Sequence, residues 1–173
     1  MRRVAPFCAA LLLLGTQAAV WSDEKPAKKA PDGVYAVLRD SQKEKDVLPL
    51  KEGEALVVNR HRYLKDADKE PPRYVVVRST PDVMLDLAGK PKAVKDGDAG
   101  IRILLKLEPK AAAALERVTQ KHEGRPLAIV LGGEVVTQHK IRGVIRGGDV
   151  QITSCAPGGA EYLLEKLEAR QKK

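Results

Sequence analysis

The chain has 173 residues, with 31 lysines and arginines against 23 aspartates and glutamates, and a formal net charge of +8. This length suits one domain with its own hydrophobic core. The positive charge raises nucleic acid as a partner. However, the basic residues are interleaved with acidic ones, as in residues 43–46, and aromatic residues make up only 3% of the chain. Base stacking therefore has few candidates, and we predict no nucleic-acid partner.

The first 22 residues have the pattern of a secretory signal peptide. Arg2 and Arg3 give a positive start, residues 4–15 are mostly apolar, and Val20 and Ser22 have the spacing that a signal peptidase favours. We therefore predict cleavage after Ser22 or within three residues of it, and a periplasmic or secreted location.

An uncleaved membrane anchor is the alternative for this segment. An anchor needs roughly 20 apolar residues, but Pro6 interrupts the run early and residues 16–17 interrupt it late. After cleavage we expect no membrane span, and only weak attraction of the basic surface to anionic envelope surfaces. Cys155 would then be the single cysteine, so no internal disulfide can form.

The next segments predict a linker followed by a β-rich N-terminal half. Residues 23–32 are charged, contain proline and lack an apolar period, which is typical of a disordered linker. Residues 33–100 form the β-rich half. Its strands are expected where valine and tyrosine are enriched, at residues 34–38, 55–59 and 74–78.

Residues 101–170 have a more regular pattern, which predicts the order βαβββα. Apolar and polar residues alternate over 101–107, and Pro109 opens a helix that ends at Gly124. A hairpin and further short strands then precede a last helix. They are residues 127–131, a hairpin partner at 134–137 after Gly132-Gly133, and two short strands at 140–145 and 150–153. The class is therefore α+β: a small antiparallel or mixed sheet with two helices packed on one face, preceded by the β-rich half.

The residue types used in catalysis and metal binding are present but do not form a known motif. The three histidines, His61, His122 and His139, are scattered. His122-Glu123 begins like a zinc-protease motif, but Pro126 stands where the second histidine is required. We therefore predict no catalytic residue, no metal ligand and no cofactor-binding residue.

The three Gly-Gly pairs, which begin at Gly132, Gly147 and Gly158, lack the Lys-Ser or Lys-Thr that completes a phosphate-binding loop. We interpret all three pairs as turns.

One stretch of the second half carries a family resemblance. Residues 124–133 read Gly-Arg-Pro-Leu-Ala-Ile-Val-Leu-Gly-Gly, preceded by Leu107, Ala111, Leu115 and Thr119 and followed by Val135-Val136, Ile141-Arg142, Ile145, Gly147-Gly148 and Gln151-Ile152-Thr153. In this order and spacing, residues 101–168 resemble the periplasmic region of SecD, an accessory subunit of the bacterial protein-export translocon. Residues 33–100 match that family only loosely.

The resemblance implies a fold, a compartment and a contact role towards exported polypeptides. Two departures stand out: Gln138-His139 replaces an Ala-Pro step, and residues 154–159 replace a Gly-Asn-Phe-Thr segment. The family's membrane helices have no counterpart up to Lys173, so no residue of a proton pathway is carried over. We predict a non-enzymatic domain that binds unfolded polypeptide or an envelope protein.

Two other hypotheses remain open at this stage. One is a structural domain of the envelope that has no link to export. The other is a cysteine-dependent enzyme built around Cys155 and a histidine, although no pattern near Cys155 supports a nucleophile.

Overall fold

The computed structural model describes residues 30–63, 69–97 and 100–171. The predicted signal peptide and most of the predicted linker lie outside these residues. The helices are η1 (Glu44–Asp46), α1 (Pro109–Lys121) and α2 (Pro157–Gln171). The strands are β1 (Gly33–Ala36), β2 (Arg39–Ser41), β3 (Glu54–Asn59), β4 (Arg73–Arg78), β5 (Lys92–Lys95), β6 (Ile101–Lys106), β7 (Pro126–Leu131), β8 (Glu134–Lys140) and β9 (Asp149–Cys155).

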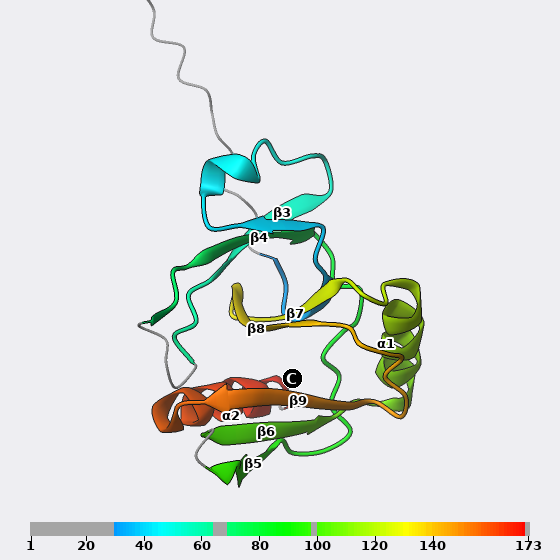
Figure 1. The fold of residues 1–173 in the computed structure, drawn as a ribbon. Coiled ribbons are helices and arrows are strands. Elements are labelled where there is room, and N and C mark those ends of the chain that lie inside the picture. The colour runs from blue at the N-terminus through cyan, green and yellow to red at the C-terminus, as the bar shows by residue number, and fades with distance from the viewer. Residues whose placement is uncertain (1–29, 64–68, 98–99, 172–173) are drawn as a thin grey trace, which may run out of the picture.

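The larger sheet has six strands in the order β1-β7-β8-β3-β4-β2. Figure 1 labels its strands β3, β4, β7 and β8, which lie above the smaller sheet in that view. Its pairs are antiparallel except β3 and β8, which meet in parallel where Val58 faces Glu134. The end strands β1 and β2 follow each other in the chain. Between them, Val37 N donates to Pro126 O at 3.0 Å and Leu38 N donates to Val76 O at 2.9 Å. The sheet therefore curls until its two ends meet.

The curled sheet encloses a core of its own, built from one face of each long strand. On β7, Ala128 and Val130 point into this core, whereas Ile129 and Leu131 belong to the other core, as expected for a strand buried on both faces. The rest of the enclosed core consists of Ala30, Tyr35, Val37, Ala55, Val57, Val75, Val77 and Val135.

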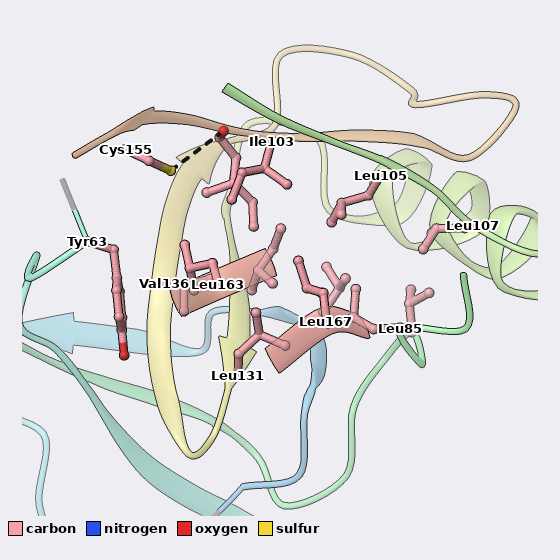
Figure 2. Packing of buried hydrophobic residues seen from close by; sticks show 14 of the residues in the cluster. Tyr63, Leu85, Ile103, Leu105, Leu107, Leu131, Val136, Cys155, Leu163 and Leu167 are labelled. Carbon is pink, nitrogen blue, oxygen red and sulfur yellow. Dashed lines mark hydrogen bonds between the residues drawn. The ribbon is translucent and has the colours of Figure 1, made fainter. Parts of the chain in front are cut away.

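The smaller sheet has three antiparallel strands in the order β5-β6-β9. Its buried face contributes Ile103, Leu105 and Ile152 to the principal core (Figure 2). The other buried members of that core come from both helices, from β1, β7, β8 and β9, and from connecting segments: Val34, Tyr63, Val83, Leu85, Leu107, Ala111, Leu115, Ile129, Leu131, Val136, Cys155, Ala160, Leu163 and Leu167. The predicted α+β class, with two helices and a strand-rich N-terminal half, is confirmed.

Strands from the two predicted halves pair with one another. β1 pairs with β7, β3 with β8, and β5 with β6. The packed chain begins before Gly33, because Ala30 is buried and Asp32 binds both the Gly132 N–H, at 2.7 Å, and the guanidinium of Arg170, at 3.0 Å.

Two local predictions are wrong. The strand predicted at residues 140–145 is absent, because β8 ends at Lys140 and residues 141–148 form a loop. That loop is held by α1 instead, since Ile145 N donates to Thr119 Oγ1 at 3.0 Å. The turn predicted at Gly158-Gly159 is also wrong, because both glycines lie in the first turn of α2.

The tight turn at Gly132-Gly133 is confirmed. Leu131 pairs with Glu134 across the turn, and the two glycines have φ of 62° and 81°. Positive φ at both central residues is the backbone that a two-residue hairpin of this type needs.

Candidate interaction site

An apolar groove lies between the two sheets and has a volume of about 280 Å³. Its walls come from β7, β8, the loop 141–148 and the start of β9. The lining residues are Leu127, Ile129, Thr137, His139, Lys140, Ile141, Ile145, Asp149, Val150 and Gln151. We refer to this feature as the apolar groove.

The alternating pattern of β7 and the anchoring of the loop explain why this groove is apolar. Leu127 and Ile129 stand on the face of β7 opposite to Ala128 and Val130, so they line the groove while their neighbours fill the enclosed core. On the far wall, Ile145 is fixed by the bond from its N–H to Thr119 Oγ1. That hydroxyl itself donates to Leu115 O at 2.9 Å, so α1 positions the loop.

The edge of β9 borders the groove. Among the described residues β9 pairs only with β6, so its second edge carries no strand. Asp149, Val150 and Gln151 of this edge line the groove. An unpaired strand edge beside apolar side chains is the geometry that lets an extended peptide add a strand.

The other edge of the small sheet has a different character. All four residues of β5 are exposed, and two of them, Lys92 and Lys95, are lysines. Lysines on an edge strand oppose pairing with another chain. The β9 edge is therefore the better surface for an extended polypeptide.

A second, polar pocket adjoins the groove and shares His139 and Lys140 with it. It contains His61 and His139, which no sequence pattern predicts to lie together. Thr137 Oγ1 and His139 Nε2 lie 2.8 Å apart at the boundary between the two hollows. The third histidine, His122, lies elsewhere, at the end of α1, where burial lowers its pKa.

Within residues 30–63, 69–97 and 100–171, no three residues of the His, Cys, Asp or Glu types come together to hold a metal ion. Cys155 is fully buried in the principal core, with its Sγ 3.9 Å from the carbonyl oxygen of Ile152 (Figure 2). Burial raises the pKa of this thiol. A reactive cysteine needs the opposite shift, because the thiolate is the nucleophile.

The chain belongs to the SecDF P1 head subdomain family, whose model matches residues 51–169. The match begins well upstream of residue 101, so β3, β4 and β5 are part of the family's region. The SecD-like character inferred from residues 101–168 is therefore confirmed.

Two solved structures are similar to part of the chain. One is a SecDF described as a membrane component that enhances protein export, at 35% identity over 47% of this chain and 36% of that chain, with a TM-score of 0.42. The other is SecDF in a super-membrane-facing form, at 34% identity over 47% of this chain and 11% of that chain, with a TM-score of 0.41. Both comparisons thus cover well under half of the longer protein. No curated protein matches the chain.

In the part of the chain that the structure describes, no helix combines the length and apolar character needed to cross a bilayer.

Proposed function

We propose that this SecD-like head domain acts in protein export by binding extended polypeptide outside the cytoplasm, without catalysing a reaction. The observation that carries the proposal is the unpaired edge of β9 beside the apolar groove. An unfolded polypeptide offers unpaired backbone groups and apolar side chains at alternate positions. The β9 edge can pair with the backbone groups, and the groove can receive the apolar side chains.

The expected affinity is modest. The partner must lose conformational freedom when it is ordered along β9, and only the surplus over that cost appears as binding free energy. We therefore expect a Kd of about 1 μM or weaker, which corresponds to roughly 8 kcal/mol or less. Weak and reversible binding suits a polypeptide that must dissociate from the domain again.

The test is to measure association of the domain with unfolded and folded forms of one exported protein. Ile145→Asp places a charge in the groove and should weaken binding of the unfolded form at least fivefold. Ile145→Ser, a milder change, should weaken it less. Met84→Asp is the matched control, because Met84 is an exposed apolar residue, 47% accessible, that does not line the groove.

Equal binding of folded and unfolded forms, or equal effects of the Ile145 and Met84 variants, would contradict the proposal. Absence of binding to either form would leave the hypothesis of a structural envelope domain. Thermal melts of all variants establish that each is folded at the temperature of the assay.

The proposed location depends on the N-terminal signal, which lies outside the described residues. The support is the sequence pattern of Arg2-Arg3, the apolar run and Ser22, together with membership of the SecDF P1 head family. Intact mass of the protein recovered from an envelope fraction tests it. A mass that retains Trp21 would contradict cleavage near Ser22.

A further inference from the structure

The polar pocket next to the apolar groove has a volume of about 410 Å³. It lies where β3 and β8 end and β4 begins, and its polar side chains include Asn59, His61, Glu70, Arg73, Gln138 and His139. Two of these side chains have buried polar atoms without a hydrogen-bond partner among the described residues: His61 Nε2 and Gln138 Oε1. We refer to this feature as the polar pocket.

His61 is held in the pocket in a costly conformation. Its side chain is only 8% exposed, and its φ of 54° lies in the left-handed region, which is uncommon for residues other than glycine, although histidine adopts it more often than most. Asn59 Oδ1 fixes the backbone by accepting from His61 N at 3.0 Å. Glu70 Oε2 lies 3.7 Å from Nε2, beyond hydrogen-bond distance, on a side chain that is 65% exposed.

Gln138 supplies the second unsatisfied atom. Its Nε2 faces Asp40 Oδ2 at 3.4 Å, which directs Oε1 away from that carboxylate. A buried polar atom without a partner lowers stability, because it loses its hydrogen bonds to water and gains none in the protein. Two such atoms in one pocket, one of them on a strained residue, indicate a site whose ligand supplies the missing hydrogen bonds.

The charges around the pocket favour a neutral ligand. Arg73 is paired with Asp40 at 3.0 Å, and the remaining charged residues, Glu70 and Lys140, have opposite signs. Gln138 Oε1 requires a donor, and His61 with its hydrogen on Nε2 requires an acceptor. A secondary amide offers both groups at once.

We propose that the polar pocket binds a peptide group of an extended polypeptide. Gln138 Oε1 accepts from its N–H, and His61 Nε2–H donates to its carbonyl oxygen. The inference rests on the proposed function, because the occupant is the same class of ligand and the pocket shares His139 and Lys140 with the apolar groove. The groove would hold apolar side chains, and the pocket would hold the backbone that continues past them.

The test uses the whole domain and the capped peptide acetyl-Val-Ser-Val-Ser-Val-amide, which contains no asparagine or glutamine. Titration is followed by NMR at the His61 ring and the Gln138 side-chain amide, which should both shift and saturate. Gln138→Leu should weaken peptide binding at least fivefold while the melting temperature stays unchanged or rises, because the variant removes an unsatisfied atom and Asp40, which loses the long 3.4 Å contact with Gln138 Nε2, keeps its ion pair with Arg73. His61→Asn, which tolerates positive φ, should weaken binding to a similar extent.

Ester analogues of the peptide locate the contact. Replacing one peptide N–H by oxygen should weaken binding to the wild type. The ester analogue and the parent peptide should bind Gln138→Leu with equal affinity, since the two changes remove the same hydrogen bond. Propionamide tests whether a side-chain amide is the better ligand. Saturation by propionamide at lower concentration than the peptide would overturn the assignment to the main chain.

The outcomes separate this inference from the proposed function. A peptide that leaves the His61 and Gln138 signals unmoved overturns the inference, even if unfolded protein still binds through Ile145. A peptide that saturates the pocket while unfolded protein fails to bind overturns the proposed function alone. Loss of binding in Gln138→Leu together with a lower melting temperature would make Gln138 structural and would also overturn the inference.

Discussion

A Cβ atom on Gly159 would lie 2.7 Å from the carbonyl oxygen of Tyr63 and 2.9 Å from its Cα. The same carbonyl accepts a hydrogen bond from Ala156 N at 2.9 Å. The first turn of α2 is therefore pressed against the backbone of residue 63. The ring of Tyr63 stacks on Tyr162 with 5.5 Å between centroids, which extends this contact along the helix. The glycine is required because any side chain would occupy the space of the Tyr63 backbone.

Gly159→Ala should therefore destabilise the domain. Overpacking of this kind typically costs about 1–3 kcal/mol. Gly158→Ala is the matched control in the same turn, where an added Cβ meets nothing within 4 Å. That variant should be neutral, or more stable by up to about 1 kcal/mol through helix propensity. Urea unfolding of the two variants gives the comparison, and equal midpoints would contradict the close packing of α2 on Tyr63.

The hairpin turn between β7 and β8 provides a second prediction. Gly132 has φ of 62°, and an added Cβ would meet nothing within 4 Å, so only backbone conformation penalises a side chain there. Gly132→Ala should lower the free energy of unfolding by about 1–2 kcal/mol. Gly132→Asn should cost less, because asparagine visits the left-handed region more readily. Thermal or urea unfolding checks the order; if asparagine costs as much as alanine, backbone strain is not the cause.

The ion pair between Arg39 and Glu54 should make stability depend on pH in the acid range. Nη1 and Nη2 of Arg39 donate to the two carboxylate oxygens of Glu54, each at 2.8 Å. The hydrogen bonds from Arg39, followed by the one from Lys51 N, lower the pKa of Glu54 from 4.5 to about 2. Folding therefore favours the ionised carboxylate. The contribution of this ionised carboxylate to the free energy of unfolding is complete above the unfolded pKa near 4.5 and is lost as the pH falls towards 2.

Glu54→Gln tests this linkage. The variant should be less stable than wild type at pH 7, and the difference should shrink steadily between pH 4.5 and pH 2. Glu52→Gln, at an exposed position in the turn just before β3, is the control and should follow the wild-type curve. A difference between wild type and Glu54→Gln that stays constant with pH would show that the glutamine acts through packing.

The parts of the fold that were predictable from the sequence depend on local patterns. Alternation over residues 101–107, Pro109 at the start of a helix and the glycine pair at 132–133 each specify their element within a few residues. The strand β5 was missed because Lys92 and Lys95 are exposed, so the segment lacks a buried stripe. The helical glycines at 158–159 were misinterpreted because the reason for one of them is distant in sequence: Gly159 accommodates the backbone of Tyr63.

The candidate site was less predictable than the fold. The candidate site combines the unpaired edge of β9 with the apolar groove. Their position depends on β8 and β9 belonging to different sheets, which no local pattern reveals. The polar pocket joins His61 and Gln138, whose Nε2 and Oε1 atoms respectively lack partners because of how distant strands meet. A buried atom without a partner has no signature in a sequence.

The last prediction concerns Cys155 and the hypothesis of a cysteine-dependent enzyme. The side chain is fully buried in the principal core among Ile103, Ile152 and Leu163, and burial raises the pKa of its thiol. Alkylation requires both access and the thiolate, so the folded protein should react with iodoacetamide at least about 100-fold more slowly than the same protein in 8 M urea at the same pH.

This measurement has two controls. Free cysteine gives the rate of an unperturbed thiol, and Cys155→Ser should show no labelling of the mature domain. Cys155→Val should remain folded and bind unfolded polypeptide like wild type, because valine fills much of the volume with apolar atoms. A folded protein that alkylates faster than its unfolded form would identify an activated thiolate and would favour the enzyme over the binding domain.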